Sequence, residues 1–248
     1  MNHPALEIDY DPSDELKLRY ELLCQQRPTL RARAAANQLN VAEAELLASR
    51  ANDTSFHLMN HPEALFTALQ DVGEVLIVTR NESVVLEKKG SFKGLIFNTQ
   101  NGLHTLQSDS LGLRLLLNNF RYAFLVIEEK QSGHNKSLQF FDRNGQAGQK
   151  IYLTQNSHEQ AFEKIITKFI SGYQPTYLDI SKAKVSEQIM PEQDVEWHTL
   201  RQGWQAMQSS HDFFKLLIGS NVTRQQAYDN VGRDLAYEIV PAALHQLC

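Results

Sequence analysis

The feature that most constrains the fold is a change of hydrophobic period at residue 74, where helical spacing gives way to short β-rich runs. The segment EVLIVTRNESVVLEKKG predicts two strands around a polar RNE turn. The stretches GLIFNTQNGLHTL, LGLRLLLNNF and YAFLVIEE predict further short strands, and SLQFFDRNGQAGQKIYLT predicts a hairpin with RNG at its turn. Together these runs predict an antiparallel meander.

Helical spacing flanks this region on both sides. SDELKLRYELLCQQRP has apolar residues at positions 16, 20 and 23 before Pro28, and TLRARAAANQLN, VAEAELLASRA and HPEALFTALQDVG predict three more helices. Asn40 is expected to cap the helix that follows it, with Glu43 as its capping-box partner. SHEQAFEKIITKFIS predicts a closing helix. The expected fold is therefore α+β, with N-terminal helices packed on a large antiparallel sheet.

The chain is expected to divide into two parts joined by a linker. Residues 13–171 form the α+β part, and residues 172–193, with two prolines and no sustained period, are predicted to be the linker. Helical spacing resumes over residues 194–248, in VEWHTLRQGWQAMQSSHDFFKLLIG and TRQQAYDNVG. The last stretch, PAALHQLC, starts like a helix and ends without a cap, so the chain is expected to stop within an element.

The composition narrows the class of protein. A content of 42% hydrophobic and 21% charged residues is ordinary for a globular protein, and a net charge of −5 gives no long-range attraction to nucleic acid or anionic lipid. Cys24 and Cys248 form no CxxC metal motif, and no apolar run approaches the roughly 18 residues that span a bilayer. The N-terminus lacks a secretory signal. We therefore expect a cytoplasmic protein without membrane insertion.

His211 lies in the middle of an apolar helical stripe formed by Trp204, Met207, Phe214 and Ile218, because residues three and four apart share a helix face. One interpretation is a buried histidine that bonds a backbone carbonyl, which is the commoner situation for such a residue. The other is an axial ligand to a flat, apolar metallocycle, which needs a neutral imidazole on a rigid element among aromatic and aliphatic neighbours. No set of hard ligands nearby favours a zinc site.

Arg114 is the second candidate. As a strand, LGLRLLLNNF places the leucines at 111, 113, 115 and 117 on one face and Arg114, with Gly112 and Leu116, on the other. Most strand arginines of this kind are solvated surface residues. The functional interpretation is a fixed cation facing a cavity, able to pair with a carboxylate or to donate to a bound oxygen ligand.

Other motifs give weaker signals. His57 and His61 have a helical metal-binding spacing, but Pro62 follows at once, and His104 has no predicted face. Rossmann, P-loop, nucleophile-elbow and HExxH motifs are absent. Residues 29–50 resemble a helix-turn-helix, yet the second helix carries two glutamates and would repel phosphates, so a helical pair packed on the sheet is preferred.

Several stretches of the sequence resemble the bacterial HemS/ChuS haem-utilisation proteins, also called haemin-degrading factors. They are ARAAANQLNVAEAELLAS, VGEVLIVTRNESVV, LGLRLLLNNF, SLQFFDRNGQAGQKIYLT, WQAMQSSHDFF and NVTRQQAYDNVGRDLA. They occur in the family's order and cover nearly the whole chain from about residue 16. The resemblance implies two tandem α+β repeats, with haem in a cleft between helices of the second repeat and the sheet of the first.

The resemblance also implies roles for individual residues. His211, in SSHDFF, matches the family's axial ligand to the haem iron, and Arg114, in LGLR, matches the arginine on the distal side. Arg224, in NVTRQQ, matches a basic residue near the propionates. Met207 and Phe214 would then shape the helix side of the haem pocket.

Two departures from the family pattern matter. Leu116 stands where relatives often carry phenylalanine, and the chain stops where the strands of the second repeat should begin. The second repeat is therefore expected to be represented only by its helical start, without the further haem contacts of its sheet.

The implied function is that of a cytosolic haem-binding protein of haem uptake and iron acquisition, acting as a haem carrier, a haem-degrading factor, or both. In degradation, Arg114 would stabilise polarised oxygen while the macrocycle supplies most of the reactivity. The implied partners are haem, a haem importer and a downstream haem oxygenase, and pairing of two copies is left open. A helix-turn-helix regulator and a truncated remnant with weak haem binding are the alternatives.

Overall fold

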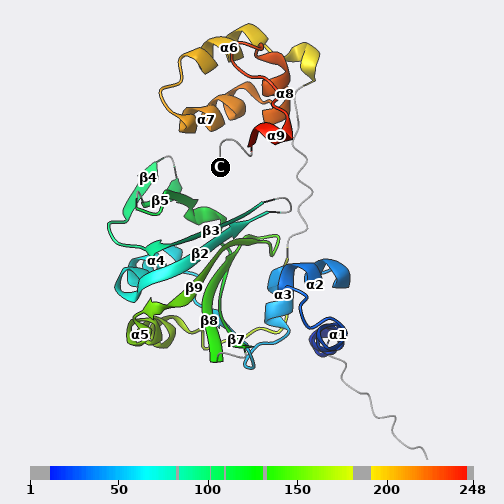
Figure 1. Ribbon diagram of the computed structural model, residues 1–248, viewed down its shortest axis with the longest axis vertical. Helices are drawn as coiled ribbons and strands as arrows, with labels where there is room; N and C mark the ends of the chain where they lie inside the picture. The colour runs from blue at the N-terminus through cyan, green and yellow to red at the C-terminus, as the bar shows by residue number, and fades with distance from the viewer. Residues whose placement is uncertain are drawn as a thin grey trace, which may run out of the picture. The chain divides into compact units, whose positions relative to one another are not determined.

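The computed structural model describes residues 12–81, 84–100, 102–108, 110–130, 133–180 and 191–244 (Figure 1). The chain divides into two compact units, residues 1–183 and 184–248, and each has buried hydrophobic clusters of its own. The first unit combines helices with two antiparallel sheets, and the described residues of the second form helices without strands. The α+β class predicted from the sequence is thereby confirmed.

The elements of the first unit follow the predicted order. Its helices are α1 (Pro12–Gln26), α2 (Ala32–Leu39), α3 (Glu43–Ala48), α4 (Pro62–Leu69) and α5 (Glu159–Phe169), with short 3-10 turns at Gln70–Val72 and Leu117–Asn119. Its strands are β1 (Ser55–Leu58), β2 (Gly73–Arg80), β3 (Val85–Ser91), β4 (Ile96–Gln100), β5 (Leu103–Ser108), β6 (Leu113–Leu116), β7 (Tyr122–Lys130), β8 (Gly133–Phe141) and β9 (Ala147–Ser157).

The strands form two sheets rather than one continuous meander. The larger sheet has six strands in the order β1-β7-β8-β9-β2-β3, and the smaller has three in the order β4-β5-β6. β2 therefore pairs with β9 as well as with its chain neighbour β3. β1 is not predicted by the sequence pattern, because its four residues are too few to establish a period and its partner β7 is distant in the chain.

The predicted RNG turn connects β8 to β9. The carboxylate oxygen Oδ1 of Asp142 accepts backbone N–H bonds from Asn144 at 2.8 Å and Gln146 at 2.9 Å. Gly145 adopts φ +70°, and a Cβ there would lie 2.6 Å from the Cβ of Ala42. Glycine is thus required both by the left-handed backbone and by the close approach of this turn to the start of α3.

The turn between α2 and α3 differs from the prediction. Asn40 is the C-cap of α2, in a left-handed conformation with φ 57° and ψ 42°. α3 begins after Ala42, whose backbone N–H donates to Glu45 Oε2 at 2.6 Å. Asparagine tolerates the left-handed C-cap position because its side chain is short and polar. The predicted capping of α3 by Asn40 and Glu43 is therefore wrong.

Helices cover both faces of the larger sheet. Figure 1 shows α3 on one side of this sheet and α4 and α5 on the other. On the α4 side, Phe66 stacks on Phe140 with ring centroids 4.8 Å apart, and Phe92 meets Phe66 edge-on at 5.4 Å. On the α3 side, the edge-on pair of Phe124 and Phe141 packs with alanines and Leu47 of α3. Neighbouring residues Phe140 and Phe141 thus face opposite cores, as strand alternation requires.

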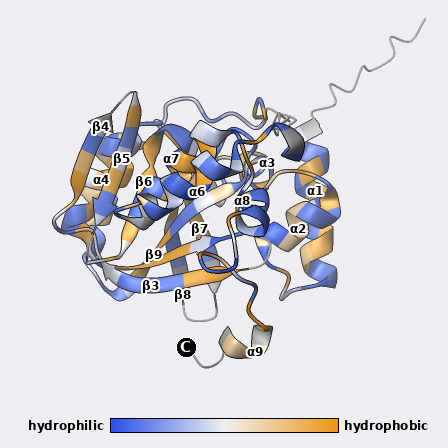
Figure 2. Cartoon of the chain, turned by 90° about the horizontal axis from the view of Figure 1, so that it is seen from above, coloured by the Kyte–Doolittle hydropathy of each residue, from blue (hydrophilic) through white to orange (hydrophobic). Residues whose placement is uncertain are grey.

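A buried ion pair fixes α3 to the sheet. Lys150 Nζ, on β9, donates to Glu43 Oε1 at the start of α3, and both side chains are almost fully buried. Losing either partner of such a pair leaves an uncompensated buried charge, which costs about 3–5 kcal/mol. Helices α1 and α2 take no part in this ion pair. Figure 2 shows that both carry hydrophilic and hydrophobic stretches. The register of α3 on β9 is therefore set by charge as well as by packing.

The start of the predicted linker is held against the first unit. Leu178 is buried with Phe124 and Phe141, and the Tyr122 hydroxyl donates to the backbone oxygen of Asp179 at 2.6 Å. Gln174 exchanges two hydrogen bonds with the backbone of His57, at 2.6 and 2.9 Å. This segment has no hydrophobic period because it contacts the first unit through individual residues and not through a continuous helix or strand face. Residues 181–190 of the predicted linker lie outside the described residues.

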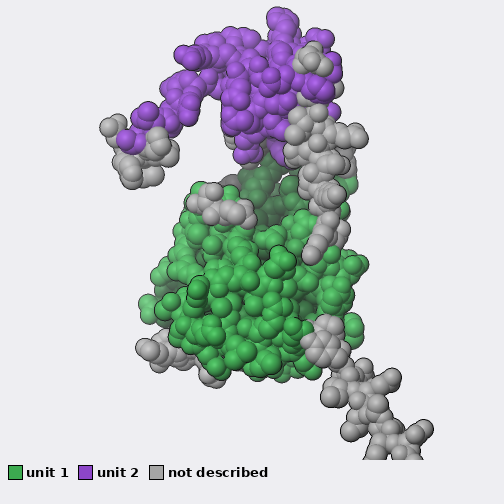
Figure 3. All heavy atoms as spheres, turned by 90° about the vertical axis from the view of Figure 1, so that its right-hand side faces the viewer, with its two compact units in different colours: residues 1–183 green, residues 184–248 purple. Residues whose placement is uncertain are grey.

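The second unit is a small helical bundle, shown in purple in Figure 3. It contains α6 (Trp197–Gln205), α7 (Ser210–Ser220), α8 (Arg224–Asn230) and α9 (Pro241–Leu244), preceded by a 3-10 turn at Glu192–Asp194. Its core is formed by Val195, Leu200, Leu217, Val222, Ala227 and Val231. In neither unit do the described residues include a helix that is both long enough and apolar enough to cross a membrane.

His57 allows a test of the packing around Phe124, on the α3 side of the larger sheet. Its ring meets Phe124 edge-on at 5.1 Å, neither ring nitrogen has a hydrogen-bond partner among the described residues, and burial lowers its pKa. The unfolded chain therefore binds more protons than the folded one below about pH 6.5. We expect the free energy of unfolding to fall as the pH drops below this value, and His57→Phe to reduce that dependence.

Urea unfolding at pH 7.5 and 5.5 measures the effect. His104→Gln, which changes an exposed histidine of the same unit, serves as the control and should keep the wild-type pH dependence. If the pH dependence were unchanged in His57→Phe, burial of the His57 ring would not lower its pKa in the folded protein.

Candidate functional site

Arg114 lies on the outer face of the smaller sheet. Leu115 is 8% exposed, and the leucines at 111 and 117 are also buried, whereas Arg114 is exposed. Leu113 packs partly buried against the same core, and Leu116 is half-buried on the other face. The predicted division of this segment into a leucine face and an arginine face is confirmed.

The residues around Arg114 form a surface of mixed polarity, on which Asn98, Thr105 and Gln107 accompany exposed apolar side chains. Strand pairing aligns Arg114 with Gln107 and Gln107 with Ile96, and it aligns Leu116 with Thr105. Directly paired residues project to the same face, as do alternate residues such as Leu103 along β5. Ile96 is 55% exposed and Leu103 is 53% exposed. We call this the strand surface, defined by Ile96, Leu103, Gln107, Arg114 and Leu116.

His104 belongs to the opposite face of the smaller sheet. It alternates with Leu103 and shares its face with Leu106, which is completely buried. Its ring nitrogen Nδ1 lies 3.1 Å from the Thr99 hydroxyl, across the β4–β5 ladder. The face of His104, which the sequence left open, is therefore not the face of Arg114.

The predicted helical stripe through His211 is not continuous. α6 ends at Gln205 and α7 begins at Ser210, so Trp204 and Met207 do not lie on the helix that carries His211. The break is made by Asp212, whose Oδ2 accepts the backbone N–H groups of Gln208 at 3.2 Å and Ser209 at 3.1 Å. This Ser-x-x-Asp capping arrangement starts a new helix.

The same bonds affect the charge of the capping residue. The N–H donors of Gln208 and Ser209 hold the pKa of the Asp212 carboxyl below its ordinary value. Asp212 therefore keeps its negative charge beside the positive end of α7, which favours the helix start.

An aromatic cluster, rather than the predicted stripe, attaches α7 to the bundle. Trp204 meets Phe213 edge-on with centroids 4.7 Å apart, and Phe213 stacks on Tyr228 of α8 at 5.5 Å. Leu217, one turn further along α7, is buried in the same core. Phe213 and Leu217 thus define the inner face of α7, whereas Phe214, a member of the predicted stripe, does not lie on that face.

The outer face of α7 carries the predicted ligand residue. His211 is the second residue of α7, and positions 214 and 218 follow it on one helix face. Phe214 is 55% exposed and Ile218 is 65% exposed. The direction of the His211 side chain lies outside the described part of the structure. We call the residues His211, Phe214 and Ile218 the helix surface.

Met207 and Arg224 lie elsewhere in the second unit. Met207 is half-buried in the turn between α6 and α7. Arg224 is the exposed first residue of α8, directly after Thr223, which exchanges hydrogen bonds with Gln226 at 2.9 and 3.1 Å. The capping bonds fix the backbone that carries Arg224 and leave its side chain at the surface.

The other sequence candidates do not assemble into sites. His57 lies on β1 and His61 precedes α4, so the two do not share a helix. Over the described ranges, no three His, Cys, Asp or Glu side chains are grouped to hold a metal ion. In α3 the residues Ala44, Leu46 and Leu47 are buried and Glu43 is paired with Lys150, so this helix presents no face to a DNA groove.

The outward direction of Phe214 can be tested against its neighbour. We expect Phe213→Ala to lower the free energy of unfolding of the second unit by about 2 kcal/mol or more, because its ring contacts are lost. Phe214→Ala removes an exposed ring and should change that free energy by less than about 0.5 kcal/mol.

Tryptophan fluorescence during urea unfolding measures the second unit alone, because both tryptophans, Trp197 and Trp204, belong to it. Equal losses in the two variants would contradict the assignment of an inner and an outer face.

Comparison with known proteins identifies related sequences. Residues 40–169, more than half of the 248-residue chain, match the domain family described as Haemin-degrading HemS.ChuX domain. The Hemin transport protein HmuS of Yersinia pestis is 37% identical over 222 residues, which are 90% of this chain and 63% of that protein. The chain therefore spans less than two thirds of the length of this relative.

Solved structures with the same fold carry similar descriptions. Holo-PhuS, a heme-binding protein from Pseudomonas aeruginosa, is 30% identical with a TM-score of 0.88, covering 96% of this chain and 68% of PhuS. ChuS, described as an E. coli heme oxygenase, is 30% identical with a TM-score of 0.80, covering 94% of this chain and 67% of ChuS.

Proposed function

This chain belongs to the family of the haemin-degrading HemS/ChuX domain, and from that premise we propose that it is a haem-binding protein of haem uptake and iron acquisition. The observation that carries the proposal is the exposure of large apolar side chains, Phe214 and Ile218 on the helix that carries His211, and Ile96 and Leu103 on the face that carries Arg114. Its relatives are described as a hemin transport protein, a heme-binding protein and a heme oxygenase, which supports the same ligand.

The helix surface suits the proximal side of the macrocycle. A neutral imidazole nitrogen of His211 coordinates the haem iron in this proposal, and Phe214 and Ile218 cover the ring plane around it. Complete burial of such side chains contributes about 1.5–3 kcal/mol each, so the exposed half of Phe214 or Ile218 contributes about 1 kcal/mol. Met207 borders the same side from the preceding turn. Arg224 neutralises a propionate.

The strand surface suits the distal side. Ile96, Leu103 and Leu116 offer apolar contacts, and Arg114 is a permanent cation on the same face. The proposal assigns Arg114 to the face of the haem opposite His211, where the guanidinium stabilises negative charge that develops on oxygen. The macrocycle supplies the reactivity, and the chain supplies binding, orientation and charge.

Degradation and transport make different demands on these residues. Both need His211 and the helix and strand surfaces, and only degradation needs Arg114 to act on reacting oxygen. The proposal assigns the protein to the cytoplasm, where it receives haem from an importer. If it acts as a carrier, it passes the haem to a separate haem oxygenase.

Substitution of the ligand tests the proposal directly. We expect haemin titrated into the wild type to give a Soret band, and His211→Ala to shift the band and weaken binding by at least about tenfold, since even outer-shell changes cost 10- to 100-fold in metal affinity. His198→Ala, which removes an exposed histidine of α6 in the same unit, should retain the wild-type spectrum. An identical Soret band and affinity in His211→Ala would refute the axial assignment.

The role of Arg114 is tested by the fate of the bound haem. With ascorbate and catalase present, we expect the wild-type Soret band to decay, and Arg114→Gln to slow this decay by about 100-fold, as for loss of one donor to developing negative charge. Arg143→Gln, in the exposed turn between β8 and β9, is the matched control. Equal decay rates in wild type and Arg114→Gln would show that Arg114 has no role in haem degradation. A stable wild-type Soret band would show that the protein carries haem without degrading it.

A further inference from the structure

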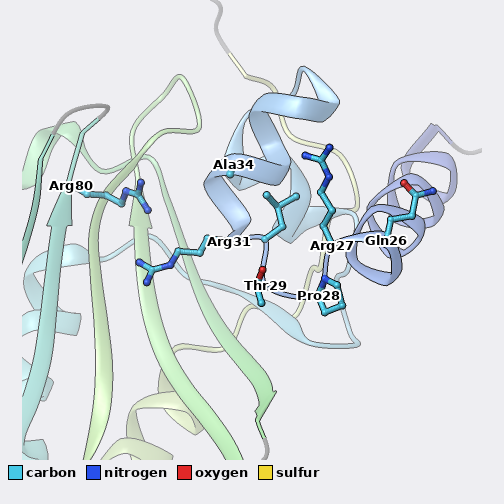
Figure 4. A pocket seen from close by; sticks show the side chains of 8 residues that line it. Gln26, Arg27, Pro28, Thr29, Arg31, Ala34 and Arg80 are labelled. Atoms are coloured by element: carbon cyan, nitrogen blue, oxygen red, sulfur yellow. The ribbon is translucent and has the colours of Figure 1, made fainter.

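A pocket lies in the first unit, away from both surfaces described above. It is an open surface pocket of about 500 Å³ between the α1–α2 turn and the end of β2 (Figure 4). Three arginines, Arg27, Arg31 and Arg80, line it. None of its lining residues belongs to the strand surface or the helix surface.

Two of the arginines approach one another from different elements. Figure 4 shows Arg80, from β2, and Arg31, from the start of α2, extending toward one another, whereas the side chain of Arg27, from the turn after α1, points away from them. Among the described residues, no carboxylate lies within ion-pair distance of these three guanidinium groups. Two permanent cations that face one another repel, so an anion placed between Arg31 and Arg80 gains energy from both.

Arg80 also has an unmet hydrogen-bonding requirement. Its Nε atom is buried and has no hydrogen-bond partner in the described structure. A buried donor on a charged group is costly to leave unpaired, and an anion beside the guanidinium offsets part of this cost by compensating its charge.

The start of α2 adds further donors. Arg31 is the N-cap residue of this eight-residue helix, and its side chain makes no capping bond. The first backbone N–H groups of a helix have no partner within the helix, and they lie at its positive end. Because Arg31 and Ala34 both line the cavity, this end of α2 borders the same space.

The size of the pocket indicates a compact ligand. A cavity of about 500 Å³ lies within the range that holds small organic molecules.

We propose that this pocket binds a small phosphorylated molecule, with its phosphate held by Arg31 and Arg80 at the start of α2. One guanidinium group can donate two parallel hydrogen bonds to two oxygens of the same phosphate. Gln26 and Thr29, which also line the cavity, offer an amide and a hydroxyl to the organic part of the ligand. This function is independent of haem binding and uses residues of the first unit alone.

Calorimetric titration of the full chain with ribose 5-phosphate, inorganic phosphate and ribose tests the proposal. Ribose 5-phosphate should bind, inorganic phosphate should bind more weakly, and ribose should not bind. Arg80→Gln should weaken ribose 5-phosphate by about 10- to 100-fold, the loss expected for one charged hydrogen-bonding partner. Arg143→Gln, an exposed arginine outside the pocket, should bind as the wild type does. The haemin Soret titration should be the same in all three proteins.

Several results would overturn the proposal. They are the absence of binding by either phosphate compound at millimolar concentration, equal binding by wild type and Arg80→Gln, and equal losses in Arg80→Gln and Arg143→Gln. Binding of a short DNA duplex that Arg80→Gln abolishes, without binding of ribose 5-phosphate, would replace it with a nucleic-acid site. If Arg80→Gln does not fold, Arg31→Gln, at an exposed residue, carries the same comparison.

Discussion

The packing of the smaller sheet onto the aromatic core is the constraint on which the strand surface depends. Leu106 and Leu115 are buried in the same cluster as Phe66 and Phe140, although they belong to a sheet of their own. Because side chains alternate along a strand, burial of Leu115 obliges Arg114 to face outward. A slip of one residue in β6 would bury the guanidinium and expose the leucines, so the core that stabilises the unit also sets the direction of Arg114.

In the second unit, a helix cap and an aromatic cluster determine which face of α7 is buried and which is exposed. Asp212 decides where α7 begins, and Phe213 and Leu217 decide which of its faces packs inward. Phe214 and Ile218 are exposed as a consequence, on the face that begins with His211. The exposure of Phe214 and Ile218 is what the proposed haem-binding role of this helix requires.

Prediction from the sequence succeeded where a pattern extended over several residues and failed where a single contact decided the outcome. The alternation around Arg114 and the turn at Asp142–Gly145 were predicted correctly because both are local. The stripe from Trp204 to Ile218 satisfied helical spacing, yet one carboxylate that caps the chain at Ser209 interrupts it. β1 and the pocket arginines could not be predicted, because Ser55–Leu58 finds its partner in β7 and Arg80 meets Arg31 only through the fold.

The two proposed sites would differ in the kind of ligand that each can bind. A flat macrocycle with one metal needs broad apolar contact and few polar groups, and the exposed apolar side chains of α7 and of the smaller sheet could provide that contact. A compact anion needs several donors around a small volume, and Arg31, Arg80 and the start of α2 could provide them. Since apolar side chains gain nothing from phosphate and two facing cations gain little from a porphyrin plane, the two proposed sites are suited to different ligands. Loss of one is therefore compatible with retention of the other.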